Sequence, residues 1–313
     1  MRICAPTRNS LIRTMKVGLI DVDGHRFPNL ALMKLSAFHK ACGDEVVLRT
    51  RRQFEESPLE AFDRVYAAKV FTFSPDLSYR PNAKDVRFGG TGYDLQNRLP
   101  DEVEHLMPDY GLYGITDTAY GFLSRGCPRG CPFCIVSGKE GRASRKVADL
   151  REWWSGQKNI KLLDPNLTAC PDCLDLLGQL KESRAWIDIT QGLDIRLLTD
   201  EKVDALNALK VKMIHFAWDG TDDLEPLFRR FAPQLKQRSR DRRVYVLTNF
   251  NTTREWDLHR INILREIGYD PYMMIYDKQH ADKSYRKMQR WCNNKFVFYK
   301  TRWEDFDERS IAA

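Results

Sequence analysis

The stretch Ala119-Tyr-Gly-Phe-Leu-Ser-Arg-Gly-Cys127-Pro-Arg-Gly-Cys131-Pro-Phe-Cys134 joins an apolar segment to three closely spaced cysteines. The residues Ala119–Leu123 are predicted to form a buried strand, so the cysteines lie on the loop that follows it. Gly126 and Gly130 let this loop fold closely, and the prolines stiffen it. Cysteine thiolates are the usual ligands of iron–sulfur clusters, whereas zinc usually takes four protein ligands. The spacing therefore predicts an iron–sulfur site, with zinc or three unconnected cysteines as the alternatives.

This strand is the first of six predicted strand–helix units. The apolar cores of the six strands are Ala119–Leu123, Ile160–Leu163, Trp186–Ile189, Met213–Ala217, Val244–Leu247 and Tyr272–Ile275. Thr199 and Thr252 are predicted to begin two of the intervening helices, because threonine is a favourable N-cap. Six such units in series favour a partial (β/α)6 TIM-like barrel over residues 115–300. In such barrels the chemistry lies at the carboxyl ends of the strands.

The residues before the barrel are predicted to form a small Rossmann-like α/β domain over residues 15–100. Strands are expected at residues 16–20, 45–48, 64–73 and 85–88. Pro28 suits the first turn of a helix between the first two strands. Strands that alternate with helices indicate a parallel sheet covered on its faces. An unstructured lead is expected at 1–14 and a C-terminal tail at 301–313. The best linker candidate is 91–114, which overlaps the end of the first domain.

The composition is that of a soluble globular protein, with 313 residues of which 42% are hydrophobic and 30% charged. No apolar run approaches the roughly 20 residues that span a bilayer, and no stretch resembles a signal peptide. We therefore expect a cytoplasmic protein without a membrane partner. The formal net charge of +7 would suit RNA, a phosphorylated substrate or an acidic protein. The basic residues are spread among acids, so the arginines within 49–52 and 238–243 are interpreted as solvated surface.

The cysteine spacing, C-x3-C-x2-C with the aromatic Phe133 before the last cysteine, resembles the signature of the radical S-adenosylmethionine (SAM) superfamily. The lead-in Phe122–Gly126 and the pattern from Gly18 to Leu48 resemble members that carry an N-terminal cobalamin-binding-type domain. The resemblance is loose in places and covers roughly residues 15–300.

This resemblance implies that Cys127, Cys131 and Cys134 bind three irons of a [4Fe–4S] cluster and that SAM binds the fourth. An electron from the reduced cluster would then break a carbon–sulfur bond of SAM and release a 5′-deoxyadenosyl radical. The cofactors carry this chemistry, and the protein supplies position and exclusion of water.

The resemblance also implies SAM-binding residues at the strand ends. Asp164 and Asn166 stand where the superfamily usually has a glycine-rich, glutamate-ended motif, and they are expected to accept hydrogen bonds from the SAM amino group. Arg196 is expected to pair with the carboxylate, Asp219 to contact the ribose, and Phe133 to lie against the adenine or contact it through its backbone. The structural alternatives are an Asx turn at Asp164, a rim salt bridge at Arg196 and a buried aromatic at Phe133.

Two further motifs have open interpretations. The chain has eight cysteines, and Cys170-Pro-Asp-Cys173 forms a second close pair that would need more ligands to hold a second metal. The segment from Asp23 to Pro28 nearly matches D-x-H-x-x-G, in which His25 would be a cobalt ligand, but Pro28 replaces the glycine. A degenerate domain without cobalamin is the favoured interpretation, and cobalamin is the alternative.

The sequence thus predicts a radical SAM enzyme that modifies an unidentified small molecule, peptide or RNA. Electrons would come from a reducing partner such as flavodoxin or ferredoxin. The first alternative is a cobalamin-dependent radical SAM methyl or methylthio transferase. The second is a zinc-stabilised nucleic-acid-binding protein without catalysis, which the positive charge and the Cys170/Cys173 pair would favour.

Overall fold

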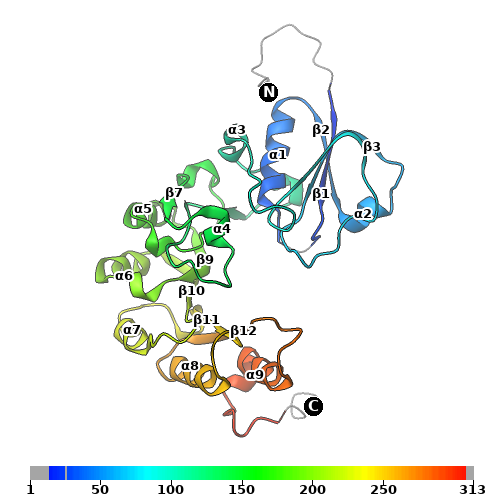
Figure 1. Cartoon of the computed structure of the whole chain (residues 1–313). Coiled ribbons are helices and arrows are strands. Elements are labelled where there is room, and N and C mark those ends of the chain that lie inside the picture. The colour runs from blue at the N-terminus through cyan, green and yellow to red at the C-terminus, as the bar shows by residue number, and fades with distance from the viewer. Residues whose placement is uncertain (1–13, 25–26, 308–313) are drawn as a thin grey trace. The chain divides into compact units, whose positions relative to one another are not determined.

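The computed structural model describes residues 14–24 and 27–307, and the chain divides into two compact units (Figure 1). The N-terminal unit comprises Met1–Gly121 with Arg151–Gln157, and the cysteine unit comprises Phe122–Leu150 with Lys158–Ala313. Residues 1–13 of the predicted lead, residues 308–313 of the predicted tail, and His25 lie outside the described residues.

The N-terminal unit contains a parallel sheet whose strands lie in the order β2-β1-β3-β4. Its strands are β1 (Lys16–Asp21), β2 (Glu45–Thr50), β3 (Ala61–Ala68) and β4 (Asn82–Gly89). Its helices are α1 (Leu30–Ala41), α2 (Arg51–Glu55), α3 (Asp101–Glu104) and the 3-10 turn η1 (Tyr110–Tyr113), and β5 (Thr118–Gly121) follows them. The predicted parallel α/β arrangement is confirmed. Residues 91–114, expected as a linker, contain α3 and η1.

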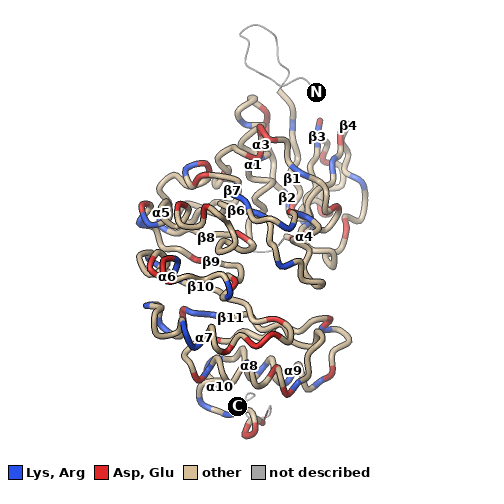
Figure 2. Tube along the Cα trace, turned by 60° about the vertical axis from the view of Figure 1, so that its left-hand side comes forward, with Lys and Arg blue, Asp and Glu red and all other residues tan. Residues whose placement is uncertain are grey.

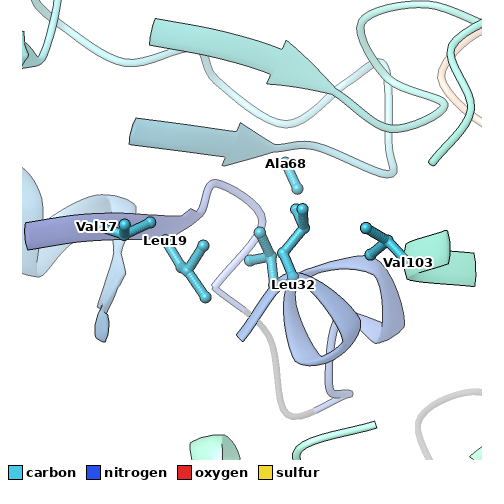
Figure 3. Close-up of a cluster of buried hydrophobic side chains, with 6 residues drawn as sticks. Val17, Leu19, Leu32, Ala68 and Val103 are labelled. Carbon is cyan, nitrogen blue, oxygen red and sulfur yellow. The ribbon is translucent and has the colours of Figure 1, made fainter. Parts of the chain in front are cut away.

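The two faces of this sheet are covered by different helices. Figure 3 shows Val17, Leu19 and Leu32 in a buried cluster that joins β1 to α1. Ile20, the next residue of β1, belongs to a second cluster together with Phe54 of α2. Each aliphatic side chain buried in this way contributes about 1.5–3 kcal/mol. Adjacent residues of β1 therefore bury opposite faces, as alternation along a strand requires.

Two local predictions in this unit were wrong. Helix α1 begins after Asn29, whose side chain accepts a hydrogen bond from the backbone N–H of Leu32, so Pro28 precedes the N-cap. Strand β3 ends at Ala68, whereas the sequence predicted it as far as residue 73. The strand ends because the backbone N–H groups of Val70 and Phe71 donate to the carboxylate of Asp23, at 2.6 and 3.2 Å, and not to a neighbouring strand.

The cysteine unit is built on parallel strands that lie side by side in chain order. They are β8 (Asn159–Leu162), β9 (Trp186–Leu193), β10 (Lys210–Ala217), β11 (Arg242–Thr248) and β12 (Asp270–Ile275). Its longer helices are α5 (Cys173–Ser183), α6 (Asp200–Asn207), α7 (Glu225–Phe231), α8 (Arg254–Glu266) and α9 (Lys283–Asn293). The short elements are β6 (Ser124–Arg125), α4 (Val136–Glu140), β7 (Arg145–Lys146), η3 (Leu167–Ala169), η4 (Ile195–Leu197), η5 (Ser239–Asp241) and α10 (Lys295–Phe298).

Aromatic side chains pack the helices onto this sheet. Phe216 of β10 meets Phe228 of α7 edge to face at 6.2 Å between ring centroids, and Trp218 stacks on Phe228 at 5.3 Å. Thr199 begins α6 as predicted, because its side chain accepts from the N–H of Lys202. Helix α8 is capped by Thr253 and not by Thr252, the residue that the capping pattern indicated. The predicted N-cap was therefore one residue too early in the sequence.

Positively and negatively charged residues are interspersed along the chain of both units (Figure 2). The arginines of the two sequence clusters form ion pairs as follows: Arg49–Glu60, Arg51–Glu55, Arg52–Glu56, Arg238–Asp241 and Arg243–Asp270. These pairs support the interpretation of the clusters as ordinary surface, except at Arg242, which is buried and donates to the carbonyl of Ala232 at 2.6 Å. In the described part of the chain, no helix is both long enough and apolar enough to cross a membrane.

Candidate functional site

The three cysteines of the motif lie on the loop between β6 and α4. All three are half-buried, and none forms a disulfide bond. Gly126, directly before the first cysteine, has φ of +89°, and a Cβ there would lie 2.1 Å from the carbonyl oxygen of Ala143. A side chain is therefore excluded at this position. The backbone N–H of Cys127 donates to the carbonyl of Gly141 at 3.2 Å, which closes the loop at its base.

The thiol of Cys131 is under the electrostatic influence of the other two cysteines and of two strand ends. Burial is the largest cause that raises its pKa, followed by the charges of Asp219, Cys134 and Cys127. Arg196 acts in the opposite direction. Asp219 follows β10 and Arg196 follows β9, so polar groups from two strand ends act on the cysteine loop.

This donor set fits an iron–sulfur cluster. Metal-bound cysteine must be a thiolate, and the positive charge of a bound iron would offset the burial and the neighbouring negative charges that raise the pKa of Cys131. Among residues 14–24 and 27–307, no three Cys, His, Asp or Glu side chains form a group that could hold one metal ion. A cubane does not require such a group, since each thiolate binds a different iron.

Asp164, which follows β8, is held against the segment that leads into the loop. Its carboxylate accepts from the backbone N–H of Leu123 at 2.8 Å, and from both the backbone N–H and the hydroxyl of Ser124. The side chain is fully buried, and burial raises the pKa of Asp164 to about 7 against the effect of these hydrogen bonds. Asp164 thus ties the strand end of β8 to the start of the cysteine loop.

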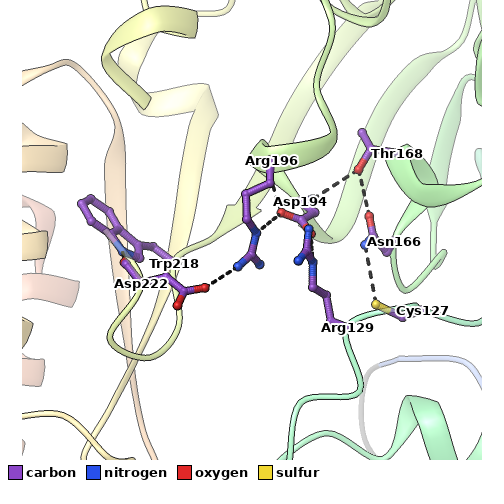
Figure 4. A network of polar contacts seen from close by, with 8 residues as sticks. All are labelled: Cys127, Arg129, Asn166, Thr168, Asp194, Arg196, Trp218 and Asp222. Carbon is purple, nitrogen blue, oxygen red and sulfur yellow. Dashed lines mark hydrogen bonds and ion pairs between the residues drawn. The ribbon is translucent and has the colours of Figure 1, made fainter. Parts of the chain in front are cut away.

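A polar network runs from the loop across the ends of β8, β9 and β10 (Figure 4). Asn166 Nδ2 lies 3.5 Å from Cys127 Sγ, and Asn166 Oδ1 lies 2.8 Å from the hydroxyl of Thr168. Thr168 Oγ1 also accepts from the backbone N–H of Asp194 at 3.3 Å. The Asp194 carboxylate forms an ion pair with Arg129, which lies between the first two cysteines of the motif.

Arg196 and Asp219 are engaged with protein groups. Arg196 Nε lies 2.7 Å from Asp194 Oδ1, and Arg196 Nη1 lies 2.8 Å from Asp222 Oδ2. Asp219 accepts from the backbone N–H of Leu247 at 3.0 Å, and burial is the main cause that raises the pKa of Asp219. The Arg196 side chain is 29% exposed, so it remains accessible at the strand ends.

Phe133 is half-buried and meets Phe250 edge to face at 5.1 Å between centroids. Phe250 in turn meets Tyr276 at 4.8 Å, so aromatic rings follow the ends of β11 and β12. The structure thus brings Asn166, Arg196 and Asp219 toward the cysteine loop. It places Phe133 among the aromatic rings and Asp164 beneath the lead-in segment.

The sequence analysis missed three residues that shape the site. Arg129 had a signal, because it is a charge inside the cysteine motif itself. Thr168 had none beyond its short distance in sequence from Asn166. Arg260 of α8 is completely buried and donates to the backbone carbonyls of Trp218 and, at 2.8 Å, Leu247. A sequence pattern cannot reveal bonds to backbone carbonyls.

Cys170 and Cys173, considered above for a second metal, are both buried. Burial raises the pKa of both thiols, for Cys173 to about 11. The backbone N–H of Cys173 donates to the carbonyl of Cys170 at 3.1 Å at the start of α5. Among the described residues, this pair does not belong to a group of three or more Cys, His, Asp or Glu side chains that could hold a metal ion. Cys4 lies outside the described residues.

The carboxyl edge of the N-terminal sheet has two notable features. A Cβ on Gly90 would lie 2.4 Å from the Lys69 carbonyl oxygen, so the chain turns tightly there. Phe71 and Phe73 stack at 5.1 Å and are 40% and 79% exposed. The predicted cobalt ligand, His25, lies outside the described residues. This edge therefore offers exposed aromatic surface.

No protein-family model matches the sequence, and no curated protein matches it. Solved structures with a similar fold include two of the radical S-adenosylmethionine methyltransferase TsrM from Kitasatospora setae. The structure with cobalamin and a [4Fe-4S] cluster bound has a TM-score of 0.60 and 12% sequence identity, over 84% of this chain and 75% of that chain. The structure with tryptophan substrate and the SAM analogue aza-SAM has a TM-score of 0.60 and 11% identity, over 83% of this chain and 72% of that chain. The chain therefore shares the fold of a radical SAM methyltransferase.

Proposed function

We propose that this protein is a radical SAM enzyme that holds one [4Fe–4S] cluster on Cys127, Cys131 and Cys134. The observation that carries the proposal is that three thiols lie on one loop, which turns tightly at Gly126. The charges of Asp219 and Arg196, which follow two strands of the sheet, act on the thiol of Cys131. The shared fold with TsrM supports the same conclusion. We further propose that the strands form the partial (β/α)6 barrel expected from the sequence.

When bound, the cluster and SAM supply one-electron cleavage of a carbon–sulfur bond in SAM. The chain's own residues would bind and orient. Arg196 is the candidate for the SAM carboxylate and Asp219 for the ribose hydroxyls, since both lie near the thiols. Phe133 would contact the adenine. Asp164 and Asn166 are buried, so we propose that they act mainly on the loop and on Cys127 and less on the SAM amino group.

A cobalamin-dependent methyl or methylthio transferase is the second candidate. The specific observations in its favour are that TsrM is described with cobalamin bound and that Phe71 and Phe73 expose apolar surface at the carboxyl edge of the N-terminal sheet. The purified protein would be reconstituted with hydroxocobalamin, desalted and examined for a corrinoid spectrum. Retained corrinoid would support this candidate, and its absence would remove it.

The zinc-stabilised nucleic-acid binder is less well supported. Most arginines of the two sequence clusters pair with acids, and Arg242 is buried, which leaves little exposed and unbalanced positive charge on those segments. If the protein bound RNA through phosphates, its affinity for RNA would fall steeply as the salt concentration rises, and an affinity independent of salt would contradict this candidate. We keep flavodoxin or ferredoxin as the proposed electron donor, and a small molecule, a peptide or an RNA as the substrate.

Anaerobic reconstitution tests the main proposal. The wild type should carry about four irons and four sulfides per chain, and with SAM and dithionite it should release 5′-deoxyadenosine. Cys131→Ala should lose both properties. Cys42→Ala is the matched control, since Cys42 is another half-buried cysteine, outside the motif, and this variant should behave as wild type. Protein that binds zinc but no iron under these conditions would contradict the proposal.

A further inference from the structure

Three consecutive hydrogen bonds lead from the end of β9 to one thiol of the cysteine loop (Figure 4). The backbone N–H of Asp194 donates to Thr168, the hydroxyl of Thr168 donates to Asn166, and the amide of Asn166 donates to Cys127 Sγ. The three residues that precede the thiol are 3–6% exposed. Water therefore has little access to these bonds.

The direction of this series is set at its first bond. A backbone N–H can only donate, so the oxygen of Thr168 accepts there and its single proton is left to donate. That proton goes to Asn166 Oδ1 at 2.8 Å, which turns the NH2 group of the same amide toward the sulfur. A flipped amide would leave the buried hydroxyl proton of Thr168 without this acceptor.

We infer that Asn166 raises the reduction potential of the cluster by donating a hydrogen bond to the sulfur of Cys127, an inference that rests on the proposed function. One electron from an external reductant converts [4Fe–4S]2+ to [4Fe–4S]+, with no proton transferred and no bond broken. The added negative charge spreads onto the sulfur ligands, so an N–H donor stabilises the reduced form more than the oxidised form. Hydrogen bonds to the sulfurs are among the factors that set cluster potentials.

Thr168 and Asp194 are positioning residues in this scheme. Thr168 orients the amide of Asn166. Asp194 supplies the backbone donor at one end, and its carboxylate pairs with Arg129 inside the cysteine motif. The same strand end thus orients the amide and holds the loop that carries the sulfur.

The test is a potentiometric titration of the reconstituted wild type and variants with dithionite, followed by the electron paramagnetic resonance (EPR) signal of the reduced cluster. Asn166→Ala should disfavour reduction about tenfold, a shift of about 59 mV to more negative potential for a one-electron couple. Thr168→Val, which replaces the hydroxyl with a methyl group, should shift the potential in the same direction. Thr168→Ser keeps the hydroxyl and should titrate as wild type.

Thr248→Val is the matched control, since Thr248 at the end of β11 is completely buried and its hydroxyl donates to the carbonyl of Met274. Its potential should equal that of the wild type. If Asn166→Ala and Thr168→Val carry full clusters and also titrate as wild type, the inference is overturned and the proposed function stands. If Asn166→Ala assembles no cluster, the comparison of Thr168→Val with Thr168→Ser decides. A wild type that assembles no cluster overturns both proposals.

Discussion

The carboxylate of Asp164 accepts a hydrogen bond of 2.8 Å from the backbone N–H of Leu123. This single contact joins the end of β8 to the segment that leads into the cysteine loop. Because Ser124 donates to the same carboxylate, the root of the loop is fixed before the first cysteine is reached. The positions of the thiols therefore depend on a buried, ionisable group.

The stability of the protein should depend on the ionisation of Asp164. Its pKa is about 7 in the folded protein and about 3.9 in an unfolded chain. A group whose pKa is raised by folding stabilises fully below its unfolded pKa, and that contribution is lost as the pH rises through the folded pKa. The free energy of unfolding of the wild type, minus that of Asp164→Asn, should therefore fall between about pH 4 and pH 7.

Urea denaturation at a series of pH values measures this difference. Asp175→Asn, on the exposed face of α5, is the matched control. A wild type and Asp164→Asn that remain parallel over the whole pH range would rule out the raised pKa.

Gly126→Ala should abolish cluster assembly. The φ of +89° is strained for alanine, and the new Cβ would lie 2.1 Å from the Ala143 carbonyl oxygen, so the loop backbone must move. The measurement is iron and sulfide per chain after anaerobic reconstitution. Gly138→Ala is the control, because a Cβ at Gly138 meets nothing within 4 Å, and it should retain the full content. Equal iron in both variants would show that the loop tolerates the change.

Arg260→Met should destabilise the protein by about 3–5 kcal/mol, because it leaves the buried carboxylate of Asp257 without its partner. Arg260 and Asp257 are both completely buried and form an ion pair. The double variant Arg260→Met/Asp257→Asn should lose less than the sum of the two single variants, since the groups act as a pair. Additive losses in urea denaturation would contradict the pairing.

Thr253→Ala should lower the free energy of unfolding by about 1 kcal/mol, because the Thr253 side chain accepts from the N–H of Trp256 at the start of α8. Thr252→Ala should have a smaller effect, since its hydroxyl has no hydrogen-bond partner in the described part of the chain. Thermal or urea unfolding of the two variants decides between them. A larger loss of unfolding free energy in Thr252→Ala would show that Thr252 is the N-cap, as the sequence indicated.

Much of the fold could be predicted from the sequence, because it depends on local patterns. The buried strands, the glycine turns and the parallel α/β arrangement all follow from apolar periodicity and punctuation. The end of β3 could not be predicted, because the side chain of Asp23, distant in sequence, captures the backbone of Val70 and Phe71.

The residues of the candidate site could be predicted where their type and spacing indicate the chemistry, as for the three cysteines. Contacts between residues that are far apart in the sequence could not be predicted. The contacts of Asp164 with Leu123 and of Asn166 with Cys127 join segments about 40 residues apart, and only folding brings them together. No rule of spacing connects such pairs.

The EPR spectrum of the reconstituted, dithionite-reduced protein, recorded with and without SAM, tests the central claim most directly. If three thiolates hold a cluster whose fourth iron is open, SAM should change the signal of the wild type, and an equal concentration of methionine sulfoxide should not reproduce that change. A reduced-cluster signal that is identical with and without SAM would contradict the account.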